Sequence, residues 1–212
     1  MPDLECLAMH ECQINTELSK IVGKMLSDFK NVIELDLTQS YLNANDAKNI
    51  ADGLMRAKRL EVIRLKKMNG LGQGVTPILY NLAFSPRIKC VDMSHLPEVN
   101  HDADTCEAIY KLVKITGSLE FLNFNLTPVF EGLTEDFFRA LGECKTLRAI
   151  LIDSHQPFGR VELFGRAVAM NCKKSGCLEI LSCVGGFDTS RLDSFLNHLY
   201  VSDYDHELWY GD

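Results

Sequence analysis

The sequence contains no long hydrophobic run and no secretory leader. Its purely aliphatic stretches, such as residues 149–152, fall far short of the roughly 20 apolar residues that a helix needs to cross a bilayer. The acidic N-terminus lacks the basic and apolar regions of a signal peptide. We therefore expect a cytoplasmic chain with no membrane partner, and the nucleus is the other compartment that fits.

Positive charge is also scarce. The chain carries 22 lysines and arginines against 29 aspartates and glutamates, which gives a formal net charge of −7. Binding to nucleic acid depends on accumulated positive charge that neutralises phosphates. The charge balance therefore argues against a nucleic-acid partner and leaves only local basic patches to consider.

Eight cysteines are present, but no two have the Cys-x-x-Cys spacing of a zinc ribbon or a redox motif. Without a secretion signal we expect reduced thiols. One loop gathers several residues of metal-binding type: His95, His101, Asp102, Asp104 and Cys106. A metal site needs at least three converging ligands, and loops of acidic proteins carry such residues for solubility alone, so we favour solubility.

A glycine-rich loop, residues 69–74, stands between an expected strand and an expected helix. Its spacing matches neither the dinucleotide-binding fingerprint nor the P-loop, and no Lys-Ser/Thr pair follows it. No serine, histidine and acid can be grouped into a catalytic triad either. The sequence therefore predicts no enzyme activity, no catalytic residue, no cofactor and no metal.

What the sequence does contain is a repeat. Among 212 residues, of which 46% are hydrophobic, one pattern recurs: an apolar residue, two others, an apolar residue, one other and an apolar residue. The units begin at Leu4, Val32, Leu60, Ile88, Leu119, Leu147 and Leu178, which are 28, 28, 28, 31, 28 and 31 residues apart. A fixed period in this range is typical of repeat architectures.

Each unit combines two hydrophobic periods. The alternation near its start is typical of a strand, and about ten residues later apolar residues recur three and four positions apart, as in a helix. In the first unit this helical stripe is Ile14, Leu18, Ile21, Val22 and Met25. A strand–loop–helix unit cannot bury its apolar faces alone, so we expect the units to stack into a parallel sheet lined by helices.

The first unit also carries a family signature. Residues 4–14, Leu-Glu-Cys-Leu-Ala-Met-His-Glu-Cys-Gln-Ile, match the pattern L-x-x-L-x-L-x-x-N/C-x-L at every position, and residues 32–42 match it nearly as well. The chain therefore resembles the leucine-rich repeat family, and its 28-residue period with a full helix resembles the ribonuclease-inhibitor subtype.

The resemblance implies an α/β fold over residues 1–200. This fold is a right-handed solenoid with seven parallel strands on the concave face and helices on the convex face. Residues 201–212 remain as a C-terminal tail. We expect this tail to cap the end of the solenoid, because the terminal core otherwise faces water.

The asparagine or cysteine position of the signature varies along the chain. It holds Cys12, Ser40, Met68, Leu96, Thr127, His155 and Gly186. We therefore expect the buried side-chain ladder that usually runs under the loops to be mostly absent.

Strand residues on either side of each central apolar position point out of the concave face. These residues change along the chain from acidic, through basic, to apolar. We expect the apolar ones to form an exposed patch, which usually marks an interaction site. The predicted partner-binding residues are Glu34, Asp36, Arg64, Lys66, Phe121, Asn123, Leu126, Leu151, Ile180 and Val184. The alternative is an internal cover, which Tyr204, Trp209 and Tyr210 of the tail offer.

Residues 56–67 form a basic cluster that has two explanations. Arg56, Lys58 and Arg59 stand where cations complement a helix C-terminus. Cross-strand pairing with acidic residues accounts for Arg64 and Lys66. We favour this structural role, and an acidic peptide partner remains the alternative.

The resemblance implies a non-catalytic module or scaffold that binds a protein partner through the concave face. Two other roles stay open. Residues 152–159 resemble one repeat of the tropomodulin C-terminal domain, which caps actin filaments, and a GTPase-activating protein for a small GTPase is built on the same repeat subtype. We also expect the N-terminal sheet edge to be uncapped and open to association with another chain.

Overall fold

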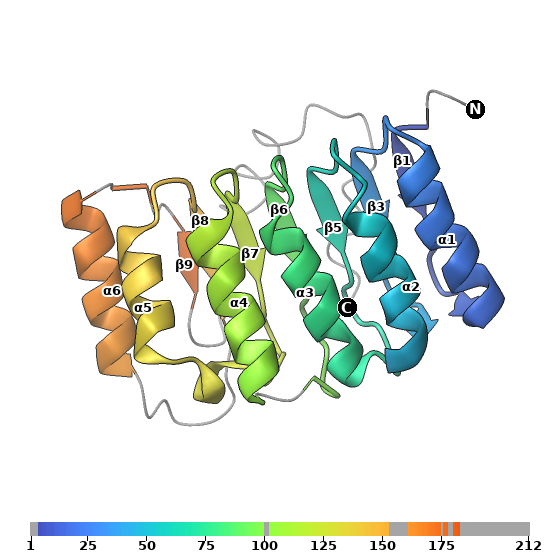
Figure 1. Cartoon of the computed structure of the whole chain (residues 1–212). Helices are drawn as coiled ribbons and strands as arrows, with labels where there is room; N and C mark the ends of the chain where they lie inside the picture. Colours follow the sequence, from blue (N-terminus) through green and yellow to red (C-terminus); the bar gives the residue numbers. More distant parts are fainter. Residues whose placement is uncertain (1–3, 100–101, 153–160, 175, 178–179, 183–212) are drawn as a thin grey trace.

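The chain is built from one layer of parallel strands and one layer of helices (Figure 1). The computed structural model describes residues 4–99, 102–152, 161–174, 176–177 and 180–182. The main sheet has the order β1 (Cys6–Ala8), β3 (Glu34–Asp36), β5 (Val62–Arg64), β6 (Cys90–Asp92), β7 (Phe121–Asn123), β8 (Ala149–Leu151) and β9 (Ile180–Ser182). Neighbours in the sheet are thus neighbours along the chain, and the predicted α/β class with a parallel sheet is confirmed.

The helices lie on one face of this sheet (Figure 1). They are α1 (Thr16–Asp28), α2 (Ala44–Leu54), α3 (Val75–Ala83), α4 (Ala103–Ile115), α5 (Glu135–Glu143) and α6 (Val161–Lys174). A short second parallel pair, β2 (Gln13–Ile14) with β4 (Tyr41–Leu42), lies in the loops that lead from strand to helix. Within the described ranges, no helix has both the length and the hydropathy that crossing a membrane requires.

The strand register follows the period of the repeat. Leu7 lies opposite Leu35, and Leu35 lies opposite Ile63. The central residues of the later strands continue this row: Val91, Leu122, Ile150 and Leu181. Because the offset is one whole unit, each strand residue faces the same side of the sheet as its counterpart in the neighbouring strand.

Polar residues determine where the helices begin. The side chains of Asn15, Asn43 and Asp102 accept hydrogen bonds from the backbone N–H three residues ahead, over 3.0, 2.9 and 2.8 Å. Thr134 caps α5 in the same way, over 3.4 Å. These residue types are preferred at N-termini because the first N–H groups have no partner inside the helix.

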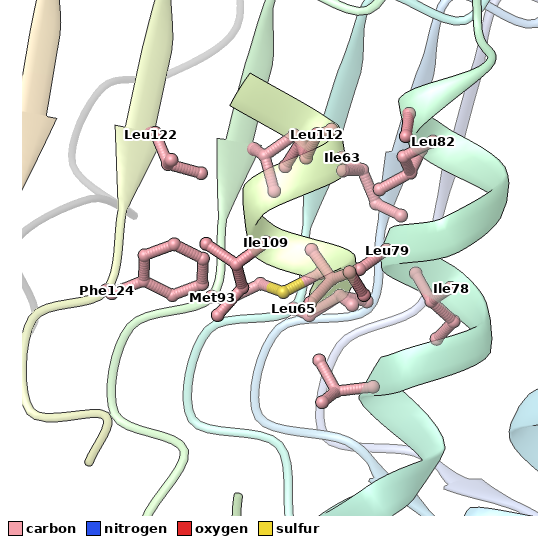
Figure 2. Close-up of a cluster of buried hydrophobic side chains, with 14 of the residues drawn as sticks. Ile63, Leu65, Ile78, Leu79, Leu82, Met93, Ile109, Leu112, Leu122 and Phe124 are labelled. Atoms are coloured by element: carbon pink, nitrogen blue, oxygen red, sulfur yellow. The ribbon is translucent and has the colours of Figure 1, made fainter. Parts of the chain in front are cut away.

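The hydrophobic core fills the space between the sheet and the helices. Figure 2 shows Leu65, Met93 and Phe124, each directly after a strand, lying toward Leu79 and Ile109 on the helices. All five side chains are buried. Three phenylalanine rings extend the core with edge-to-face contacts: Phe130, Phe138 and Phe164.

The side-chain ladder under the loops is better populated than the sequence predicted. Ser40 Oγ donates to the backbone carbonyl of Met9 over 2.8 Å and accepts the N–H of Cys12 over 3.1 Å. Thr127 Oγ1 makes the equivalent pair of bonds to the preceding unit, over 2.6 and 3.1 Å. The ladder that the sequence predicts to be mostly absent is present at these two units, because a hydroxyl both donates and accepts, as an asparagine side chain does.

Helices α1 and α2 pack through two glycines. A Cβ added to Gly53 would lie 2.3 Å from the backbone oxygen of Gly23, and one added to Gly23 would lie 2.1 Å from the backbone oxygen of Asn49. Because the obstacles are backbone atoms, no side-chain rotation relieves these clashes. The close approach of the two helices therefore requires glycine at both positions.

Gly53→Ala is expected to lower the free energy of unfolding by about 1–3 kcal/mol, the usual cost of overpacking a filled site. The matched control is Gly165→Ala in α6, where an added Cβ meets no atom within 4 Å. The control should raise stability by about 0.5–1 kcal/mol, because alanine favours a helix over glycine. Urea unfolding followed by circular dichroism measures both, and equal effects of the two substitutions would contradict the close contact.

Candidate functional site

The sheet face opposite the helices, here called the outer face, is charged on its first strands. The guanidinium of Arg64 forms ion pairs with Glu34 and, over 3.4 Å, with Asp36. Oδ2 of Asp36 also lies 3.1 Å from Nε2 of His10. The predicted cross-strand pairing of Arg64 is confirmed, and these ion pairs link β5 to β3.

Three outer-face residues also close the loops that follow their strands. Oδ1 of Asp36, Asp92 and Asn123 accepts the backbone N–H two residues ahead, over 2.9 Å in each case. Aspartate and asparagine form such turns readily. Asp36 and Asn123 therefore have a structural role at the strand ends, and their contact with a partner stays a prediction.

The apolar outer-face residues are not exposed. Phe121 is 0% exposed and Leu151 is 1% exposed, so the prediction that they form a solvent-facing patch is wrong. Neither belongs to the core between sheet and helices. Burying their apolar surface removes it from water, at a gain of about 25 cal/mol per Å².

Several predicted residues fall where the structure gives no side-chain description. Val184, residues 201–212 and His101 lie outside the described residues, as do residues 153–159 of the tropomodulin-like segment. Ile180 is described by its backbone alone, as the first residue of β9. Their predicted roles stay predictions.

Asp92 and Lys66, a second pair of charged residues on the outer face, have shifted pKa values. Burial raises the pKa of the Asp92 carboxyl, while hydrogen bonds from Ser94 and the positive charges of Lys66 and Arg64 act against this shift. Burial also lowers the pKa of the Lys66 ammonium, with Asp92 opposing and Lys67 adding to the effect. The raised pKa means that the Asp92 carboxyl is harder to ionise in the folded chain than in the unfolded chain.

Asp92→Asn removes this charge and keeps an oxygen acceptor for the Ser94 N–H, as Asn123 does in the next strand. Because folding raises the pKa of Asp92, its stabilising contribution is complete below the unfolded-state pKa and is lost as the pH rises through the folded-state pKa. The melting temperature of the variant minus that of the wild type should therefore increase from about pH 4 to about pH 7. Differential scanning calorimetry measures this difference in melting temperature. A difference that stays constant or falls with pH would contradict the raised pKa of Asp92.

A groove of about 720 Å³ runs along the carboxyl ends of the strands. Its lining includes one residue from each of five successive units: Glu11, Gln39, Lys67, His95 and Leu126. The same five residues have left-handed backbone conformations, with φ between 53° and 59°. Because five successive units each place one side chain in it, this groove is the candidate functional site.

Backbone hydrogen bonds hold these left-handed residues in place. The N–H groups of the first four donate to backbone carbonyls of the next unit, over 2.7 to 3.3 Å. A residue other than glycine in this conformation is costly, and it persists only where its surroundings enforce it. Recurrence in five units shows that the turn itself imposes the conformation, and the five side chains consequently share one groove.

Of these five residues, only Leu126 is among the partner-binding residues that the sequence predicts. The signal that identifies the other four is their spacing, because each stands one position before the asparagine or cysteine site of the repeat signature. Leu126 is half-exposed, in contrast to the buried Phe121 and Leu151. It is thus the one predicted apolar residue among these three that is accessible to a partner.

The glycine-rich loop has a structural role. The N–H of Gly70 donates to Oε2 of Glu98 over 2.8 Å, and a Cβ on Gly70 would lie 2.6 Å from the ring of Tyr41. The carboxylate of Glu98 already accepts the hydrogen bond from the N–H group that a phosphate would use. In the described part of the chain, no three histidine, cysteine, aspartate or glutamate side chains are grouped to hold a metal ion.

Comparison with known proteins gives a local similarity. No protein-family model matches the chain. A stretch of 84 residues, 40% of this chain, is 30% identical to NLR family CARD domain-containing protein 4 from Rattus norvegicus, and the protein of that name from Bos taurus gives the same identity and length. The chain spans about 8% of the length of these relatives.

Proposed function

We propose that the chain is a non-catalytic protein-interaction module of the leucine-rich repeat type, similar to the ribonuclease-inhibitor subtype, and that its partner binds along the groove. The observation that carries this proposal is the repeated geometry at the carboxyl ends of the strands, where five units each place one side chain in the groove. The local similarity to a much longer curated protein supports this proposal, because an interaction module can form one part of a larger chain.

The dimensions of the groove favour an extended peptide segment as the bound element. Neighbouring strands lie about 4.8 Å apart, so five units extend over about 20 Å. An extended chain covers that distance with about six residues. The partner in this proposal is therefore a protein that presents a strand-like segment or loop across the five units.

The order of side chains gives the groove a direction. Glu11 and Gln39 supply carboxylate and amide groups at one end, and Leu126 supplies an apolar contact at the other. A segment with a polar end and an apolar end fits in one orientation only. Such complementarity contributes to specificity.

In this proposal the main contacts come from the groove, and the outer-face residues predicted from the sequence contribute less. Phe121 and Leu151 are buried, so this proposal assigns no partner contact to them. The charged network of Glu34, Asp36, Arg64 and Lys66 lies beside the groove and would orient the partner. The actin-capping and small-GTPase roles remain predictions from resemblance.

Combined substitution of Glu11→Lys and Leu126→Asn tests the groove. Asparagine tolerates left-handed backbone, so the variant should fold with an unchanged melting temperature. We expect affinity capture from lysate, quantified by mass spectrometry, to recover at least tenfold less of a specific partner with this variant than with the wild type.

The control is Arg139→Glu, on the exposed surface of α5, which should recover the partner at the wild-type level. Recovery of the same proteins in the same amounts by all three chains would refute the groove as the binding site. Recovered actin or a recovered small GTPase would identify the partner class, and filament-end or GTP-hydrolysis assays would then follow.

A further inference from the structure

A second surface lies at the C-terminal ends of the helices, away from the groove. Met55 follows α2, Phe84 follows α3 and Ile115 ends α4; their exposed fractions are 58%, 64% and 45%. Helix α3 packs against α2 on one side and α4 on the other (Figure 1). Three successive units therefore present large apolar side chains to water at equivalent places, which is typical of an interaction surface.

A hollow of about 130 Å³ opens between the ends of α2 and α3. Its lining includes Met55, Lys58, Asn81, Phe84, Ser85 and Pro86. An apolar cavity of about 150 Å³ holds a benzene-sized molecule. The hollow therefore has room for one apolar side chain of a ligand.

Ser85 indicates that such a ligand also carries a polar group. This residue is 9% exposed, and its buried Oγ has no hydrogen-bond partner among the described residues. Buried hydroxyls are nearly always paired, and an exception requires an explanation. A backbone N–H or carbonyl of a bound peptide, placed in the hollow, would complete this hydrogen bond.

Lys58 lines the hollow, and Arg56 and Arg87 directly follow its lining residues Met55 and Pro86 in the sequence. Arg56, Lys58 and Arg87 are exposed, and none forms an ion pair with another described residue. The helix dipole accounts for cations near a helix C-terminus, but it accounts neither for the apolar row nor for the unpartnered hydroxyl. On a chain of net charge −7, this local positive surface selects a negatively charged ligand.

We propose that the hollow binds an acidic linear peptide of another protein. The peptide inserts one apolar side chain between Met55 and Phe84, completes the hydrogen bond of Ser85 Oγ and sets its carboxylates beside the three cations. This assignment gives a function to the basic cluster at residues 56–59. It does not depend on the groove, which lies at the opposite ends of the helices.

Selection of a phage-displayed library of random linear peptides on the full chain tests the proposal. The expected consensus is a large apolar residue flanked by aspartates and glutamates. Its synthetic, fluorescein-labelled form should bind Phe84→Asp and Lys58→Glu at least tenfold more weakly than the wild type in fluorescence anisotropy. The matched control is Ile21→Asp on α1, a comparably exposed apolar residue outside the hollow, which should bind the peptide like the wild type.

Ser85→Ala separates the ligand role of the hydroxyl from a role in stability. Removing a buried hydroxyl without a partner should raise the melting temperature of the free chain, and the same substitution should weaken binding of the consensus peptide. Unchanged affinity would contradict the hydrogen bond that the proposal assigns.

Two other results would overturn the proposal. One is a selection that gives no acidic consensus, or a consensus that binds Phe84→Asp as well as it binds the wild type. The other is self-association in sedimentation experiments that Phe84→Asp abolishes, because the occupant of the hollow would then be a second copy of the chain.

Discussion

No unit of this chain can bury its own apolar faces, and the structure depends on this constraint. Each internal strand and helix packs against the unit before it and the unit after it, so the units are held in a register of one whole repeat. Side chains such as Leu35 and Ile63 therefore meet counterparts from the neighbouring unit. The same constraint brings α1 and α2 so close that glycine backbones form their contact.

The candidate binding surfaces lie where stacking of the units ends. Strands and helices pack against their neighbours along their lengths, whereas the turns at both ends of each unit leave the core. The groove forms from the turns after the strands, and the hollow beside Phe84 forms from the turns after the helices. Variation in these turns therefore has less effect on packing than variation inside the layers.

The sequence predicts the strand positions well because burial determines them. The apolar spacing around Leu7, Leu35 and Ile63 reports which side chains face the helices, and the structure pairs these residues as expected. Hydrophobic alternation also places Phe121 on the correct face of the sheet. It does not determine whether that face is exposed, so the predicted exposure of Phe121 is wrong.

The candidate site was harder to predict because it depends on backbone conformation and on distances between distant residues. Left-handed conformation at Gln39 or His95 has no strong residue signature, since neither is glycine. The missing partner of Ser85 Oγ is a property of its three-dimensional surroundings. Ser40 is a third case. The repeat signature names only asparagine and cysteine at this position, but the serine hydroxyl makes the ladder hydrogen bonds there.

The column of left-handed residues separates recognition from folding. Glutamate, glutamine, lysine, histidine and leucine all occupy the same turn. Main-chain hydrogen bonds hold this turn, together with side chains of other residues such as Asp36 and Ser40, and the side chain of the left-handed residue itself is not needed. Selection can therefore exchange one of these side chains without altering the turn, and duplication of a unit adds one more such position. Specificity in a chain of this kind can evolve one unit at a time, and a designer can alter it in the same increments.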